Sequence, residues 1–105
     1  MTGSPLTCDP HGIPAEEREE HFIRIEQLFG LAVERRELPD GLAFRFPAAL
    51  LLEVARFVDN ERRCCPFLGF AIELPPDEGA LTLRLTGPDG VRAFLAAELG
   101  GEPLV

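Results

Sequence analysis

Three cysteines are the side chains of this sequence best suited to chemistry. Cys64 and Cys65 are adjacent, and Cys8 lies near the N-terminus. A disulfide between the two neighbours would be strained, because linked half-cystines usually lie about 4.4–6.8 Å apart at Cα and successive residues only about 3.8 Å apart. Two adjacent sulfurs can instead bind one polarisable cation, since metal–sulfur bonds are longer than sulfur–sulfur bonds. Burial of unreactive cysteines is the competing interpretation.

Pro66 controls how the two adjacent side chains are aimed. Proline disfavours the helical region for the residue before it, so we expect a helix to end at Cys64 and an extended segment to start at Cys65. Arg62 and Arg63 favour thiolate formation there, whereas the negative end of the helix dipole opposes it. This irregular junction between helix and extended segment predicts that the sulfurs of Cys64 and Cys65 can point toward the same ligand.

A second set of candidate ligands lies in the N-terminal segment. Cys8 and His11 have the tight Cys-x-x-His spacing of a two-ligand metal knuckle, around a proline turn. A surface turn that contains a cysteine by chance is the alternative. If this segment folds back over the helix end, Cys8, Cys64 and Cys65 form a three-thiolate metal site with His11 as the fourth ligand. Such a site suits Zn(II), Cu(I) or Hg(II) and excludes Ca(II) and Mg(II). No organic cofactor is indicated.

Composition limits the possible partners. The 105 residues carry a formal net charge of −8, which argues against a nucleic-acid interface and against docking on an anionic membrane. No apolar run approaches the roughly 20 residues of a membrane span, and no signal peptide is evident. All basic residues are arginine, which hints at a GC-rich bacterial source. We therefore expect a cytoplasmic protein whose three cysteines stay reduced and unpaired.

Hydrophobic periodicity predicts an N-terminal arm over residues 1–13 and a single α+β domain over residues 14–105. The expected architecture is a three-stranded, largely antiparallel sheet packed with three helices, in the order α-β-α-β-β-α after the arm. The expected helices are 14–36, 47–64 and 91–99, the last stopped by the glycines at 100 and 101, and the expected strands are 42–46, 67–74 and 81–86.

Two further polar residues lie near the predicted core. Glu61 continues the apolar stripe of the second helix about one turn before Cys64, so it needs a partner if it is buried. An arginine from another element or the metal site itself would serve, unless the side chain reaches solvent. His21 lies on the shoulder of the first helix with Glu17 one turn earlier. We interpret it mainly as a boundary histidine paired with that carboxylate.

The run Glu61-Arg62-Arg63-Cys64-Cys65-Pro66-Phe67, together with Cys8 and His11-Gly12-Ile13, resembles a group of small, uncharacterised bacterial proteins. The resemblance covers most of the chain, including Leu85-Thr86-Gly87-Pro88. It implies no activity, because none is known for that group.

Three functions are compatible with these patterns. The first is a metal-binding protein with a cysteine-rich site, in metal homeostasis or resistance. The second is a thiol-dependent enzyme or redox protein that uses Cys64 or Cys65 with Cys8 as the resolving thiol and His11 or His21 as base. The third is a non-catalytic interaction module, for example a homodimer, in which the cysteines only pack.

Overall fold

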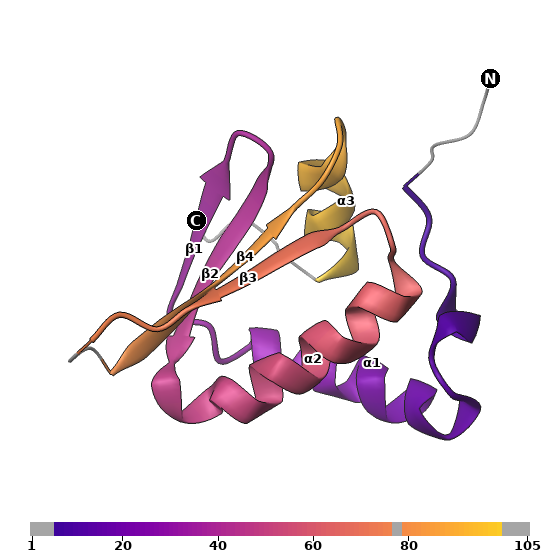
Figure 1. Ribbon diagram of the computed structural model, residues 1–105, viewed down its shortest axis with the longest axis horizontal. Coiled ribbons are helices and arrows are strands. Elements are labelled where there is room, and N and C mark those ends of the chain that lie inside the picture. Colours follow the sequence, from indigo (N-terminus) through magenta and orange to yellow (C-terminus); the bar gives the residue numbers. More distant parts are fainter. Residues whose placement is uncertain (1–5, 77–78, 100–105) are drawn as a thin grey trace.

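Four strands form one antiparallel sheet in the order β1-β2-β4-β3 (Figure 1). The computed structural model describes residues 6–76 and 79–99. The elements are η1 (Pro10–Gly12), α1 (Ala15–Phe29), β1 (Glu34–Leu38), β2 (Gly41–Pro47), η2 (Ala48–Leu50), α2 (Leu51–Cys64), β3 (Gly69–Glu73), β4 (Ala80–Thr86) and α3 (Val91–Glu98). The α+β class and the three α-helices are confirmed, but the prediction of a three-stranded sheet was wrong.

The additional strand is β1, which the sequence pattern had assigned to the first helix. That helix ends at Phe29, so the predicted span 14–36 was too long. The N–H of Val33 donates to the carbonyl of Arg45 over 2.7 Å, and β1 then pairs antiparallel with β2. The first four residues of this strand are charged and only Leu38 is apolar, which suits an edge strand that must avoid pairing with other chains.

One face of the sheet forms the core. Leu81, Leu83 and Leu85 alternate with more exposed residues along β4 and are buried. In the register with β2 they lie opposite Phe46, Phe44 and Leu42, which are also buried. The three helices contribute to the same apolar cluster, and Figure 1 shows α1 and α2 lying along one side of the sheet. The core therefore lies between one sheet face and the helices.

Helix α2 crosses from β2 to β3 and presents its predicted stripe to this core. Val54, Phe57, Glu61 and Cys64 are all buried. The helix ends at Cys64, as the following Pro66 predicts. Cys65 has left the helical region, with φ −123° and ψ 80°, although its N–H still donates to the carbonyl of Glu61 over 2.7 Å.

The N-terminal arm lies against the C-terminal end of α2. The backbone N–H of Asp9 donates to the carbonyl of Cys64 over 2.8 Å, and Ile13 is completely buried. Arg18 on α1 donates from Nε to the carbonyls of Pro10 and Ile13 over 3.0 and 3.1 Å. These contacts hold residues 8–13 in place beside the helix end.

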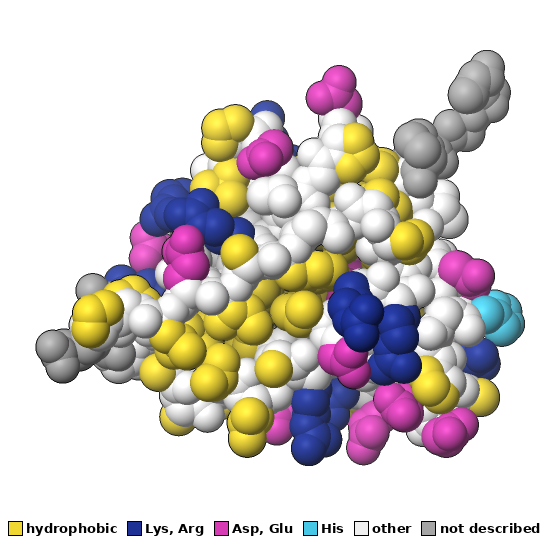
Figure 2. All heavy atoms as spheres, viewed as in Figure 1, with side chains coloured by type: hydrophobic (Ala, Val, Ile, Leu, Met, Phe, Trp, Pro, Cys, Tyr) yellow, Lys and Arg dark blue, Asp and Glu magenta, His cyan; other side chains and the backbone are white. Residues whose placement is uncertain are grey.

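The surface combines apolar and paired charged side chains. Figure 2 shows apolar side chains gathered on the face where Figure 1 places β3 and α2, with basic side chains close to acidic ones. In the described residues, no helix combines the length and apolar character needed to span a membrane. The predicted helix stop at residues 100 and 101 lies outside the described residues.

Replacement of Gly12 by alanine is expected to weaken arm docking. A Cβ at Gly12 would overlap the carbonyl oxygen of Arg63, so the arm or the helix end must move. We expect the free energy of unfolding of the reduced protein to fall by about 1–3 kcal/mol, the usual cost of overpacking. Urea denaturation measures this change. Gly79→Ala is the matched control, because a Cβ there meets no atom within 4 Å. Equal losses in both variants would contradict close docking of the arm.

Candidate functional site

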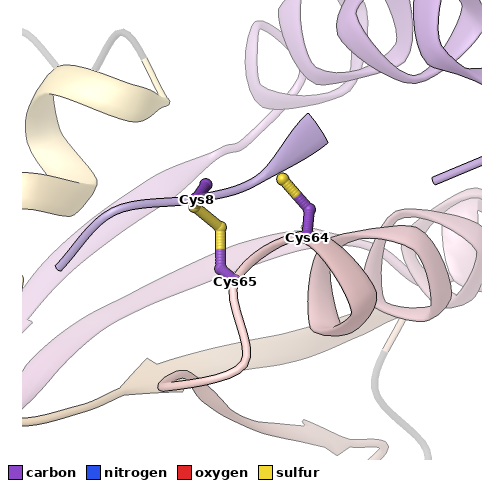
Figure 3. A group of neighbouring side chains, drawn as sticks. All are labelled: Cys8, Cys64 and Cys65. Carbon is purple, nitrogen blue, oxygen red and sulfur yellow. A yellow bond between two sulfur atoms is a disulfide. The ribbon is translucent and has the colours of Figure 1, made fainter. Parts of the chain in front are cut away.

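The three cysteines meet where the arm crosses the end of α2. The sulfurs of Cys8, Cys64 and Cys65 all lie within 4.8 Å of one another. Figure 3 shows the arm bringing Cys8 over the two adjacent cysteines, with the Cys64 side chain directed toward the arm. Cys64 and Cys65 are buried, and Cys8 is partly exposed. The prediction that sulfurs distant in sequence converge is therefore confirmed.

Cys8 and Cys65 are joined by a disulfide, whereas the sequence analysis expected unpaired thiols. Their Cα atoms are 4.5 Å apart although the residues are separated by 57 positions. This distance falls within the usual range for linked cysteines. The turn of Cys65 out of the helix directs its side chain toward the arm, which explains why Cys65 is the partner of Cys8. Cys64 remains a free, buried thiol.

His11 is not brought to the three sulfurs. Its side chain is 80% exposed, and its Nδ1 lies 3.2 Å from Oδ1 of Asp9. The same carboxylate oxygen accepts the backbone N–H of His11 over 3.0 Å, and this hydrogen bond is the main reason why the pKa of Asp9 is lowered. Asp9 thus holds His11 on the outer side of the η1 turn, and the Cys-x-x-His spacing does not form a chelating pair here.

A buried carboxylate and imidazole extend the cysteine group into the core. Oε1 of Glu61 lies 2.9 Å from Nε2 of His21, and Oε2 of Glu61 lies 3.4 Å from the sulfur of Cys65. Both Glu61 and His21 have no exposed surface. The core-facing position of Glu61 was predicted correctly. Its partner is a histidine on α1 rather than an arginine, and His21 is a core residue paired with Glu61 rather than a boundary residue paired with Glu17.

His21 has only one polar partner among the described residues. Its ring stacks on Phe57, with centroids 5.9 Å apart, and contacts Phe22 at 5.8 Å. Its Nδ1 is buried without a hydrogen-bond partner in the described structure. The contact with Glu61 places the Nε2 hydrogen toward the carboxylate, because a carboxylate only accepts hydrogen bonds. The imidazole therefore fixes the orientation of Glu61 beside Cys65.

Glu98, near the end of α3, is a member of the site that sequence analysis missed. One of its carboxylate oxygens lies within 4.8 Å of the ligand atoms of Cys8, Glu61 and Cys65. Burial raises the pKa of Glu98, and the charge of Glu61 raises it further. No spacing in the sequence connects Glu98 to the cysteines, because only the tertiary packing of α3 brings it there.

The buried free thiol is held in its protonated form. Burial raises the pKa of Cys64 to about 11, and the charges of Glu61, Glu98 and Asp9 act in the same direction. The backbone N–H of Asp9 partly offsets this effect. Cys64 is therefore a poor nucleophile near neutral pH, since the thiolate is the reactive species.

The described residues offer two overlapping sets of ligand atoms that lie close enough together to hold a metal ion. One set is Cys8, Cys64 and Cys65, and the other is Cys8, Cys65, Glu61 and Glu98. Comparison with known proteins yields no match, whether to a family model, a curated protein or a solved structure. Function must therefore be inferred from the chemistry of these side chains.

The raised pKa of Cys64 predicts a loss of stability at alkaline pH. Between about pH 9 and pH 11 the unfolded state loses the thiol proton, whereas the native state keeps it. The native state then binds more protons, so the free energy of unfolding falls as pH rises. Urea denaturation of the oxidised protein across this range measures the fall. The chain contains no tyrosine and no lysine that would obscure it.

Cys64→Ala is the matched variant, because it removes this thiol and leaves the disulfide in place. We expect its stability to depend less on pH over the same interval. An identical pH dependence in both proteins would show that Cys64 ionises in the native state as it does in the unfolded chain.

Proposed function

We propose that the reduced protein binds one thiophilic metal ion through Cys8, Cys64 and Cys65. The observation that carries the proposal is the meeting of three sulfurs, from two segments distant in sequence, within 4.8 Å. Plain packing of hydrophobic cysteines does not require this convergence. Thiolates select soft or borderline cations, so Zn(II), Cu(I) and Hg(II) are the candidate metals.

Glu61 is placed to orient one of the sulfur ligands, Cys65. In the reduced protein its carboxylate can accept the Cys65 thiol proton as a hydrogen bond, as the distance of 3.4 Å from sulfur to oxygen allows. His21 holds the opposite oxygen at 2.9 Å. Groups that orient metal ligands in this way commonly affect metal affinity without binding the ion.

The position of Cys8 suggests how the metal would act on the protein. Cys8 is the partly exposed sulfur, and it lies on the arm beside the end of α2. A bound ion would tie the arm to the end of α2 and to the core. Structural metal binding contributes on the order of 10 kcal/mol, comparable to the total stability of a domain of about 5–15 kcal/mol. A role in metal homeostasis or resistance would use the same site to sequester or transfer the ion.

Metal binding requires reduction of the Cys8–Cys65 disulfide. A dithiol reductant breaks the sulfur–sulfur bond by giving up two electrons and two protons, and it becomes a disulfide itself. The protein then holds three thiols. Their deprotonation accompanies binding of a cation, so binding of such a metal releases protons.

The proposal predicts one metal ion per reduced chain. Zn(II) titrated into reduced protein without chelator should bind at a ratio of one to one and protect all three thiols from alkylation. Each single change of Cys8, Cys64 or Cys65 to serine should weaken binding, because one of three sulfur ligands is lost. His11→Ala is the control and should bind normally. A Zn(II) affinity in Cys8→Ser equal to that of the wild-type protein would contradict the proposed ligand set.

Glu61→Gln tests the supporting role with the ligands left intact. A loss of about 10–100-fold in metal affinity is expected, as is typical for residues that orient metal ligands. Glu53→Gln on the same helix is the matched control, because its side chain is 53% exposed and pairs with Arg24 of α1 rather than with a group at the cysteines. Circular dichroism establishes that both variants are folded.

The disulfide favours a second candidate function, thiol–disulfide exchange. Cys8 is the accessible sulfur, so it would attack a disulfide of a partner, form a mixed disulfide and release one partner thiol. Cys65 would then attack the Cys8 sulfur, release the second partner thiol and restore the Cys8–Cys65 bond. The partner is reduced by two electrons, and the protein dithiol is oxidised by two.

Exchange activity predicts that Cys65→Ser traps the mixed disulfide on Cys8, because the resolving thiol is absent. Incubation with a small aromatic disulfide followed by mass spectrometry detects the adduct. The wild-type protein should release two thiols per chain under the same conditions. Equal adduct formation in wild type and Cys65→Ser would argue against this function and leave metal binding as the use of the site.

A further inference from the structure

The surroundings of the three sulfurs are acidic. Glu61 and Glu98 place carboxylate oxygens within 4.8 Å of the sulfurs of Cys8 and Cys65. His21 is the basic group that contacts this set, through Glu61.

The total charge of the loaded site differs sharply between possible ligands. Three thiolates with a monovalent cation leave a charge of −2, and a divalent cation leaves −1. A trivalent centre leaves no charge. Uncompensated charge is costly in a buried site, and nearby carboxylates add repulsion. Cys64 and Cys65 are 2% and 0% exposed, so this cost applies here. A neutral complex is therefore the most compatible with these surroundings.

We propose that the ligand of this site is a trivalent metalloid presented as its neutral hydroxide, arsenic(III) or antimony(III). The inference rests on the three-sulfur site of the proposed function, and it ranks a neutral metalloid above the candidate cations Zn(II), Cu(I) and Hg(II). Such centres form three bonds to sulfur in a pyramid, and the lone pair occupies the fourth position. The site provides this donor set, since three sulfurs converge and His11 is turned away from them.

The binding reaction balances without an oxidant or a base. One As(OH)₃ and three thiols give As(S-Cys)₃ and three waters. Three arsenic–oxygen bonds break, three arsenic–sulfur bonds form, and each thiol proton leaves with a hydroxide as water. Arsenic stays trivalent and no net proton is released.

A groove adjoins the site at Glu98. It lies between α1 and the end of α3, has a volume of about 660 Å³ and is lined by Glu98 together with Phe22, Ile25 and Phe29. The Glu98 carboxylate also belongs to the group around the sulfurs. A neutral hydroxide can pass apolar side chains at lower desolvation cost than a charged ion.

Calorimetric titration of the reduced, full-length chain with arsenite tests the inference. We expect one arsenic per chain and the same heat in two buffers of different protonation enthalpy, because no net proton is released. Zn(II) in the same buffers should give different heats. Arsenic X-ray absorption should report three sulfur neighbours and no oxygen.

The cysteine variants distinguish a three-sulfur site from nonspecific binding of arsenic by one or two thiols. Cys8→Ser, Cys64→Ser and Cys65→Ser should each lower arsenite affinity by about tenfold or more. Each should also reduce the number of sulfur neighbours from three to two, and circular dichroism establishes that each variant is folded. His11→Ala should leave both quantities unchanged.

The outcomes distinguish this inference from the proposal on which it rests. The inference alone would be overturned if Zn(II) binds through the three cysteines but arsenite does not. This would be seen as arsenite bound by only two sulfurs, or as arsenite affinity that does not depend on Cys64. Arsenite binding with release of protons would also overturn it. Failure of the reduced protein to bind arsenite, Zn(II), Cu(I) and Hg(II) through these cysteines would overturn both.

Discussion

The hydrogen bond from the N–H of Asp9 to the carbonyl of Cys64 is the contact on which the site depends. It satisfies one of the carbonyls that every helix leaves unpaired at its C-terminal end. In doing so it lays the arm across the end of α2 and brings the sulfur of Cys8 to its partners. The contact is possible because Gly12 has no side chain where the arm passes the backbone of Arg63. The hydrogen bonds from Arg18 and the burial of Ile13 hold the arm in the same position.

The buried pair of Glu61 and His21 is difficult to explain by stability alone. Buried ion pairs often contribute little, because desolvation of two polar groups offsets their attraction, and an apolar pair of similar volume is frequently as stable. Here the pair touches Cys65 directly, and one imidazole nitrogen is buried without a partner. Because Glu61 contacts both His21 and Cys65, we interpret this buried polar pair as a support for the cysteine group rather than as a source of core stability.

Local sequence signals predicted the parts of the site that lie on one element. The helical stripe of α2 indicated that Glu61 and Cys64 face the core, and Pro66 indicated that Cys65 leaves the helix. The contributions of His21 and Glu98 were not predictable, because they come from α1 and α3, and only the tertiary fold brings these helices to the cysteines. The strand β1 was missed for a related reason. Ala32 and Val33 happen to continue the helical period of α1, and pairing with β2 overrides that weak local preference.

The two candidate functions compete for the same atoms. The Cys8–Cys65 disulfide uses two of the three sulfurs, so the oxidised protein retains only Cys64 with the carboxylates nearby. One buried, protonated thiol is a poor ligand for a thiophilic ion. Oxidation must therefore release any ligand bound by three sulfurs, and a bound ligand must in turn protect Cys8 and Cys65 from oxidation. This reciprocity follows from thermodynamic linkage. Cys8 takes part in both forms, in the disulfide of the oxidised protein and in the proposed three-sulfur site of the reduced protein, so the arm stays tied to the end of α2 in each.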